Sequence, residues 1–454
     1  MPTSQPTPAY LQALLGREPA PPSSEPPPAP EASFKEVPRT FDEECLDDDA
    51  LRVIRRLTEA GHEAYMVGGS VRDLIFGLRP KDFDVATSAQ PLQVKKLFRN
   101  CRIIGRRFRL AHVFFRDKII EVATFRSGNH SGEGQENGEL LIRDDNVFGT
   151  AEEDARRRDF TINALLYDVQ RRVILDHVGG TEDAAARLVR SIGDPDVRLR
   201  EDPIRMLRAI RLSTRLGCRI DPATEQAIRR HAGEILNAAA PRIHEDLLRM
   251  FSGGAMAPAF DALMTHGLLE VILPELHQHL ARSAREGRLE EVEALRRSLR
   301  VADAWTQAGR ALSPAVRLAI LLAPVLLTPL HDAGSRDATT AVTEALRPIG
   351  QRLAISRREA ERIRQVVLAL GRFSPRNKRR RFSVTAFVKR AYFPDALDFF
   401  ELQARATGDL EPEAVRWRSR FQEVFPQGPP PPRKRAPRRR RRSREHGEKG
   451  ARTF

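Results

Sequence analysis

The sequence lacks several features that would place the protein in other classes. Its 454 residues include only three cysteines, Cys45, Cys101 and Cys218, which stand far apart in the chain. This spacing excludes a zinc module of the usual kind and gives no pattern of disulfide pairing. A low cysteine content suits a reducing compartment, so we expect a cytoplasmic protein.

Long apolar runs are also missing. The longest, LAILLAPVLL from Leu318, is interrupted by Pro324 and is shorter than the ~18 residues that a membrane span requires. The N-terminal residues MPTSQPTPAY lack the basic start and apolar stretch of a secretory signal. There is no internal repeat, and the pair His331-Asp332 has no companion histidines for a metal-dependent phosphohydrolase site. We therefore expect neither a membrane span nor a repeat protein.

Positive charge, in contrast, is abundant and unevenly distributed. The formal net charge is +15, and residues 433–454 alone carry eleven Lys or Arg and two Glu, a net charge of +9. A second basic cluster, RNKRRR, occupies residues 376–381. A basic excess of this kind indicates a polyanionic partner such as a nucleic acid.

Composition divides the chain into five segments. Residues 1–45 are rich in Pro, Ser and Ala and should be disordered, because they cannot bury enough apolar surface to fold. A mixed α/β pattern covers 46–180, and helical spacing of apolar residues covers 181–255 and 256–425. Residues 426–454 form a Pro-then-Arg tail that should be unfolded alone. The predicted fold is α+β, with a small head domain, a mostly helical neck and body, and disordered ends.

The pattern of the head predicts strands that alternate with short helices. EAYMVGG (63–69) reads as a strand that enters a glycine turn, VRDLIFG (71–77) as a short helix and DFDVAT (82–87) as a second strand. RLAHVFF (109–115) and KIIEVATF (118–125) are typical of a hairpin. Further along, apolar residues at three- and four-residue spacing predict helices over 182–191, 203–216, 223–235, 242–252, 257–268, 289–307, 313–328 and 355–370.

The second predicted strand of the head carries the strongest chemical signal. Asp82 and Asp84 stand two residues apart on it, so both carboxylates should leave the same face and repel each other unless a cation lies between them. Mg²⁺ suits this pair, because it accepts one or two carboxylates and completes its shell with phosphate oxygens and water. Upstream, Gly68 and Gly69 allow close approach of a phosphate to the amides that open a helix, and Arg72 on its first turn can reach the same phosphates. The alternative is a turn with two solvated aspartates.

These stretches resemble a known family. GGSVRD…KDFDV, residues 68–85, is similar to the first motif of the nucleotidyltransferase superfamily that includes DNA polymerase beta, and more narrowly to the bacterial class of CCA-adding enzymes and poly(A) polymerases. RRRDFTINAL (156–165), GGTEDAAARLVRSIGDP (179–195) and EDPIRMLRAIRL (201–212) resemble further motifs of that class. GRRFRLAHV (105–113) resembles the poly(A) polymerases more than the CCA-adding enzymes. The resemblance implies a polymerase-beta-like head domain.

The resemblance also implies roles for charged residues of the neck. Asp202 and Arg205 would meet the nucleotide base, Arg208 and Arg211 would hold the base or the triphosphate, and Arg158 would be another triphosphate contact. Arg205, Arg208 and Arg211 stand three apart and should form one stripe on a helix. Without the resemblance, a salt-bridged helix face on the surface would be the ordinary interpretation of such a stripe.

A third carboxylate should orient the attacking hydroxyl, and two candidates remain open. Asp159 is the one that the resemblance implies. Glu121 lies on KIIEVATF, a strand that we expect to neighbour the strand of Asp84. His112, on the strand before it, is read as a packed core residue.

Together these patterns predict a template-independent polynucleotide adenylyltransferase. It would use two Mg²⁺ ions per site to add AMP from ATP to RNA 3′ ends, and its basic clusters would bind the RNA backbone without reading bases. RNA-decay proteins could dock on the basic tail. The alternatives are a CCA-adding tRNA nucleotidyltransferase and a non-catalytic RNA-binding protein with a transferase-like head. RNA preference, processivity and oligomeric state cannot be read from the sequence.

Overall fold

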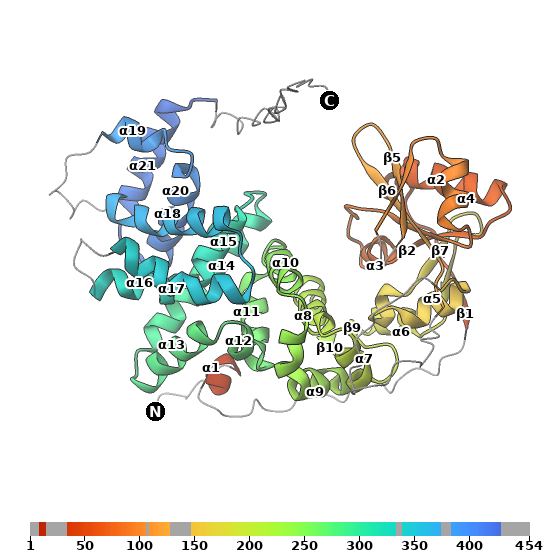
Figure 1. The fold of residues 1–454 in the computed structure, drawn as a ribbon, viewed down its shortest axis with the longest axis horizontal. Coiled ribbons are helices and arrows are strands. Elements are labelled where there is room, and N and C mark those ends of the chain that lie inside the picture. The colour runs from red at the N-terminus through yellow and green to blue at the C-terminus, as the bar shows by residue number, and fades with distance from the viewer. Residues whose placement is uncertain are drawn as a thin grey trace, which may run out of the picture.

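The computed structural model describes residues 9–14, 34–105, 109–127, 147–332, 338–373 and 383–427. The basic cluster at 376–381 and nearly all of the tail at 426–454 lie outside these ranges. Figure 1 shows a head of strands and helices and a helical body, which stand on the same side of a helical neck that joins them. The order of head, neck and body along the chain is the predicted one.

The head is built on an eight-stranded mixed sheet with the strand order β1-β8-β7-β2-β3-β6-β5-β4. Its strands are β1 (Lys35–Pro38), β2 (Ala64–Val67), β3 (Asp84–Thr87), β4 (Cys101–Ile104), β5 (Leu110–Phe114), β6 (Ile119–Thr124), β7 (Leu166–Asp168) and β8 (Val173–Asp176). β5 and β6 form the predicted antiparallel hairpin, and β3 lies parallel to β6. The predicted neighbourhood of these two strands is therefore confirmed.

Helices cover both faces of this sheet. They are α2 (Asp48–Glu59), α3 (Gly69–Ile75), α4 (Pro91–Leu97), α5 (Ala151–Arg157) and α6 (Gly180–Ala185). α2 starts at Asp47, whose side chain accepts hydrogen bonds from the first backbone amides of the helix. Apolar residues of α2, α3 and α4 pack on one face of the sheet, and Ala155 of α5 packs on the other.

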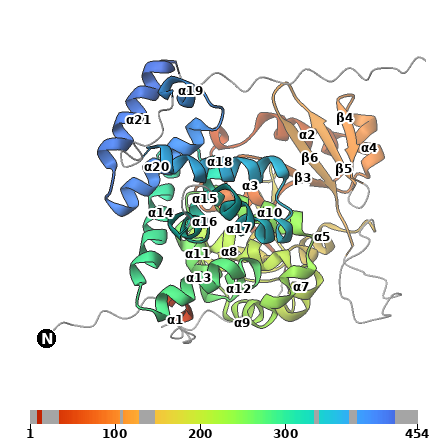
Figure 2. The same ribbon diagram turned by 60° about the vertical axis from the view of Figure 1, so that its left-hand side comes forward.

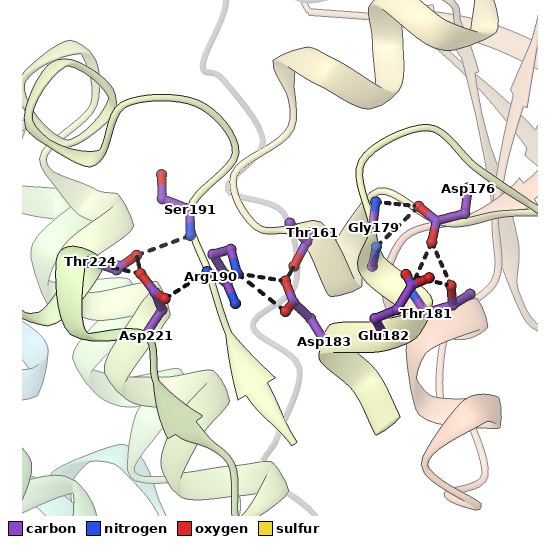
Figure 3. Close-up of polar contacts among 11 residues, drawn as sticks. Thr161, Asp176, Gly179, Thr181, Glu182, Asp183, Arg190, Ser191, Asp221 and Thr224 are labelled. Carbon is purple, nitrogen blue, oxygen red and sulfur yellow. Dashed lines mark hydrogen bonds and ion pairs between the residues drawn. The ribbon is translucent and has the colours of Figure 1, made fainter. Parts of the chain in front are cut away.

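Three carboxylates organise the junction between head and neck (Figure 3). Asp176 accepts hydrogen bonds from the backbone amides of residues 178–181 and so caps the start of α6. Arg190 lies between Asp183 of the head and Asp221 of the neck, at 3.1 and 2.9 Å. Because Asp183 and Asp221 are almost completely buried, this arginine is the charge that compensates both.

The neck follows the predicted helices except at its start. Its elements are β9 (Leu188–Val189), α7 (Pro195–Glu201), α8 (Ile204–Leu216), β10 (Arg219–Ile220), α9 (Pro222–His231), a 3₁₀ helix (Ala232–Asn237) and α10 (Ala240–Met250). The prediction of one helix over 182–191 was wrong beyond Ala185. Arg187 has a positive φ of 52°, and the chain then extends to pair β9 with β10. Backbone pairing with a distant strand thus overrides the local helical pattern.

The body consists of packed helices. They are α11 (Met256–Thr265), α12 (Leu268–Ile272), α13 (Pro274–Arg285), α14 (Leu289–Gln307), α15 (Pro314–Leu321), α16 (Ala323–Asp332), α17 (Ala338–Arg352), α18 (Arg357–Phe373), α19 (Val384–Val388), α20 (Phe393–Thr407) and α21 (Glu411–Val424). The predicted helix over 289–307 is confirmed, whereas the one over 313–328 is divided between α15 and α16, with Pro324 in the first turn of α16. In the described ranges, no helix is both long and apolar enough to cross a membrane.

The predicted disorder of residues 1–45 does not hold for every part of that segment. Residues 9–14 form α1 (Ala9–Leu14), whose Leu11 and Leu14 are buried in the core that neck and body share. Residues 35–38 form β1, which pairs with β8 at the edge of the head sheet. Composition did not reveal these anchors, because two leucines and one short strand are stabilised here by tertiary contacts. The other residues before 34 lie outside the described ranges.

Candidate active site

Asp84 and Glu121 lie on one face of the head sheet, whereas Asp82 precedes the first residue of β3. Side chains alternate along β3, so Val85 packs into the core beneath α2 and α4 while Asp84 faces the α5 side. β6 runs parallel to β3 with Glu121 opposite Asp84, and Val122 joins the same core as Val85. Glu121 therefore faces the same side as Asp84. Asp82 lies two residues before Asp84 on exposed, extended backbone.

The charge on Asp84 is held in an unfavourable setting. Burial, together with the negative charges of Glu121 and Asp82, raises the pKa of this carboxyl from 3.8 to about 6. Arg158 acts in the opposite direction. A cation bound beside Asp84 would therefore stabilise the ionised form of this carboxylate.

The glycine turn brings backbone, cation and carboxylate together. Gly68 precedes α3 with a positive φ of 71°, a conformation that costs glycine little. A Cβ at this position would lie 3.3 Å from Nη1 of Arg158 and 4.0 Å from Oδ2 of Asp84. Gly69 is the first residue of α3, where backbone amides open the helix. The turn therefore lets the backbone lie close to both Arg158 and Asp84, where a side chain would be crowded by the guanidinium of Arg158.

A cavity of about 280 Å³ adjoins this point. It is lined by Leu110, Ala123, Arg126, Asp154, Arg157 and Arg158. Arg158 caps the end of α5 and pairs with Asp154 at 2.9 Å, which fixes its guanidinium at the cavity wall. Three guanidinium groups face one carboxylate here, so the cavity is suited to an anion such as a phosphate chain.

The residues present fit a magnesium site that is completed by substrate. Among the described residues, no three His, Cys, Asp or Glu side chains gather as a ready-made metal cage. Mg²⁺ is commonly bound by only one or two carboxylates together with phosphate oxygens and water. Asp84, with Asp82 two residues before it and Arg158 of the cavity wall acting on its charge, fits that requirement.

Arg72 does not reach this cavity, although the sequence suggested a phosphate contact. Its guanidinium is buried and donates to Oδ1 of Asp73 at 2.6 Å and to Oδ1 of Asn163 at 2.7 Å. Oδ2 of Asp73 in turn accepts from Arg215 on α8 at 2.7 Å. In this structure Arg72 stabilises the first turn of α3 through these hydrogen bonds.

Asp159 is buried in a hydrogen-bond network with Arg208 and Asn163. Burial opposes its charge, but Arg208 and the donors Asn163 and the Phe160 amide outweigh burial and lower the pKa of Asp159 to about 2. Nε of Arg208 donates to it at 2.6 Å, and Nδ2 of Asn163 at 3.0 Å. Both carboxylate oxygens are therefore occupied.

The residues expected at the nucleotide base are also held by partners. Asp202 accepts two hydrogen bonds from Arg242 of α10, both 2.9 Å long. Arg205 is buried and donates to the Arg198 carbonyl at 2.8 Å and to Glu201 at 3.2 Å. Arg211, the last of the predicted stripe, pairs with Asp246 at 3.3 Å.

Sequence reasoning missed two residues that organise these groups. Asn163 connects Asp159 to Arg72 through hydrogen bonds. It lies inside RRRDFTINAL, four residues after Asp159, and this position in the motif was the signal that could have indicated its role. Arg242 follows Asp202 by forty residues, and nothing in its local sequence marks it. His112 lies 3.5 Å from Glu121 and is only partly buried, so it is not the fully packed core residue that we expected.

Three segments of the chain match families of known proteins. Residues 64–190 match the poly A polymerase head domain. Residues 217–280 match a segment described as the probable RNA and SrmB-binding site of polymerase A. Residues 333–449 match the arginine-rich C-terminus of polymerase A.

Individual proteins show the same relationship. Poly(A) polymerase I of Salmonella typhi is 38% identical over 397 residues, which cover 84% of this chain and 83% of that protein. The CCA-adding enzyme of Bacillus subtilis is 35% identical over 221 residues, or 49% of this chain and 54% of that enzyme. The crystal structure of the Bacillus stearothermophilus CCA-adding enzyme in complex with CTP aligns with a TM-score of 0.60 at 26% identity, covering 82% of each chain.

Replacing Asp84 by Asn should stabilise the metal-free protein at neutral pH. The raised pKa means that the folded state binds the Asp84 proton more tightly than the unfolded state, so its ionisation destabilises the fold progressively between about pH 4 and pH 6. Asp84→Asn should therefore raise the free energy of unfolding by roughly 1–3 kcal/mol above pH 6 and by nothing below pH 4. Thermal unfolding across this pH range, with EDTA present, measures the effect.

Adding Mg²⁺ with a nucleotide should then raise the melting temperature of the wild type but not of Asp84→Asn, which should also be inactive. Asp117→Asn, at the exposed turn between β5 and β6, is the matched control and should behave as the wild type. Equal stabilisation of Asp84→Asn and wild type by Mg²⁺ would contradict metal binding at this position.

Proposed function

This chain belongs to the bacterial poly(A) polymerases of the tRNA nucleotidyltransferase family, and from that premise we propose which of its residues perform the reaction. The enzyme is a polynucleotide adenylyltransferase that adds AMP to RNA. The sequence similarity to poly(A) polymerase I spans most of the chain. The sequence similarity to the CCA-adding enzyme of Bacillus subtilis spans about half of it. CCA addition is therefore the less supported activity.

The juxtaposition of Asp84, Gly68 and Arg158 is the observation that carries the site assignment. In the reaction, the RNA 3′-hydroxyl oxygen bonds to the α-phosphorus of ATP, the bond to the β-phosphate oxygen breaks, and pyrophosphate leaves. Asp82 and Asp84 would hold two Mg²⁺ ions, which when bound would lower the pKa of the hydroxyl and neutralise the leaving pyrophosphate. A transferase-like head without activity would have no need of such a carboxylate pair.

The triphosphate is assigned to the arginine-lined cavity. Arg158 and the amides at Gly68 and Gly69 approach it from one side, and Arg126 and Arg157 complete the positive lining. These groups are held before substrate arrives, Arg158 by Asp154, so little reorganisation is needed when negative charge moves onto the leaving phosphates. Arg72 would act indirectly, by fixing the turn.

Glu121 is the better candidate for the third carboxylate. It faces the same side of the sheet as Asp84 and acts on the charge of Asp84 more strongly than Asp82 does. Half of its side chain is exposed, so it can receive the proton of the attacking hydroxyl. Asp159 has both oxygens occupied and a pKa of about 2, which leaves it poorly suited to accept a proton.

Base recognition is assigned to Asp202 and Arg205, with Arg208 and Arg211 on the same helix. Arg242 holds Asp202 through two hydrogen bonds, so it fixes the direction in which that carboxylate presents its acceptors. Arg205 is held in the same way by Glu201. A base-binding edge whose groups are fixed before binding can discriminate ATP from CTP, because an unsuitable base leaves buried polar groups unpaired.

RNA is assigned to the helical body and the basic C-terminus. The match of residues 217–280 to a probable RNA-binding segment and of 333–449 to an arginine-rich C-terminus supports this. Phosphate contacts would provide affinity without sequence preference, and the tail could also dock RNA-decay proteins. The three described cysteines are all free, which supports a cytoplasmic location.

Exchanging each candidate third carboxylate for its amide separates their roles. Glu121→Gln should lower kcat about 100-fold or more with little change in the KM for ATP, because it removes only a proton acceptor. Asp159→Asn should instead lower the melting temperature at neutral pH, because a carboxyl with a depressed pKa stabilises the fold above pH 4 and loses this effect toward pH 2. Steady-state kinetics and thermal unfolding distinguish them, and the opposite result would assign the role to Asp159.

Removing Arg242 should weaken base selection while leaving the fold intact. Arg242 is half exposed, so its ion pair contributes little to stability. We expect Arg242→Ala to lower the ATP:CTP ratio of kcat/KM about tenfold, the effect of one charge-assisted hydrogen bond. Arg242→Lys should recover only part of it, because Lys cannot bond in a bidentate manner. Arg249→Ala, on the exposed side of the same helix, is the control, and an unchanged ratio in Arg242→Ala would exclude Arg242 from base selection.

Deleting residues 428–454 should weaken RNA binding without affecting nucleotide chemistry. A flexible tail cannot engage all eleven of its cations at once, so the slope of log affinity against log salt should decrease by about two to four. The KM for RNA should rise and that for ATP should stay constant. A full-length chain with the tail cations replaced by Gln controls for tail length, and parallel salt plots with and without the tail would show that it does not bind RNA.

A further inference from the structure

The N-terminal helix α1 is docked on the body. Leu11 and Leu14, three residues apart, retain 9% and 6% of their exposure and join the core of neck and body. α1 packs against α11 and α13, although these helices lie far from it in the sequence. Both views show α1 on the body (Figures 1 and 2). A segment at the start of the chain thus completes an apolar surface built by residues 256–285.

This docking is the reason that α1 is helical. It has six residues, and its first turn carries no acidic residue and its last turn no basic residue to favour the helix. A helix this short is unstable alone in water, so its order depends on burying the two leucines between α11 and α13. α1 therefore resembles a short peptide bound to the apolar surface of α11 and α13, which we call the groove. Because the contact is small, α1 can dissociate from the groove and bind again.

The covalent connection makes such a small contact effective. The chain returns from α1 to β1, which is fixed in the head sheet by pairing with β8, so α1 can never diffuse far from the body. A tethered segment of this kind experiences an effective concentration in the millimolar range. An external helix with equal contacts would have to exceed that concentration, or bind more tightly, to replace α1.

The surface beneath α1 lies in a segment that matches a probable binding site for RNA and a protein. α11 and the first part of α13, up to Leu280, lie within residues 217–280, which match the probable RNA and SrmB-binding site. We propose that α1 is an internal ligand that covers this groove, and that a protein partner docks there by displacing α1 with an amphipathic helix bearing apolar residues three apart. The known contact is made by leucines, which favours a protein over RNA, since RNA affinity depends on cations. The inference does not depend on the assignment of the catalytic residues.

A labelled peptide of residues 1–17 tests the groove directly. Fluorescence anisotropy should detect saturable binding, up to low millimolar concentration, to the enzyme lacking residues 1–17, and at least tenfold weaker binding to the full chain, whose groove is occupied. A peptide with Leu11→Asp and Leu14→Asp should not bind, whereas Gln12→Asp, which adds charge between them, should retain binding. Equal binding to both enzymes, or to neither, would overturn the proposal.

Hydrogen exchange of the full chain provides a second readout that does not depend on peptide affinity. Leu11→Asp with Leu14→Asp should accelerate amide exchange in α11 and α13 while the rate of AMP addition to a short RNA stays unchanged. Unchanged exchange would refute docking in solution. Adding oligo(A) to the peptide complex should leave the peptide bound, and displacement by oligo(A) would identify the groove as an RNA surface and refute a protein-docking site.

Discussion

The parallel pairing of β3 with β6 is the constraint on which the candidate site depends. It sets Asp84, the first residue of β3, opposite Glu121 of β6, and burial together with the charge of Glu121 raises the pKa of Asp84 to about 6. A fold that placed these carboxylates together without a use for a cation would only lose stability. Arg158 offsets part of this cost, because it lies against the glycine turn and lowers the pKa of Asp84.

Arginine–carboxylate pairs then fix the neck to the head. Arg208 and Arg215 stand two turns apart on α8 and reach Asp159 and Asp73 of the head, which Asn163 and Arg72 connect to each other. The result is a continuous chain of hydrogen bonds that begins and ends on α8 and joins the helix assigned to the base with the turn assigned to the triphosphate. Its members explain why so many arginines of the motifs do not themselves face the cavity.

Two short parts of the N-terminal segment pack on different parts of the molecule, although its sequence shows no clear pattern. Residues 9–14 and 35–38 have little to distinguish them from their Pro-rich surroundings, yet one contributes two leucines to the body and the other an edge strand to the head. The N-terminal segment is therefore fixed at two points on different parts of the molecule. This arrangement gives the body an apolar groove that the enzyme itself covers.

The sequence by itself determined what depends on local spacing. Periodicity located α8 and α14, and alternation located β5 and β6. The predicted strand over 82–87 begins only at Asp84, so the shared face of Asp82 and Asp84 stays a prediction. Tertiary structure alone decided which charges meet. It paired Arg72 with Asn163, Asp159 with Arg208 and Asp202 with Arg242, over separations of about 40 to 90 residues, and it ended the predicted helix at Ala185 in favour of β9. Long side chains can reach many partners, and only the packing of distant elements selects one.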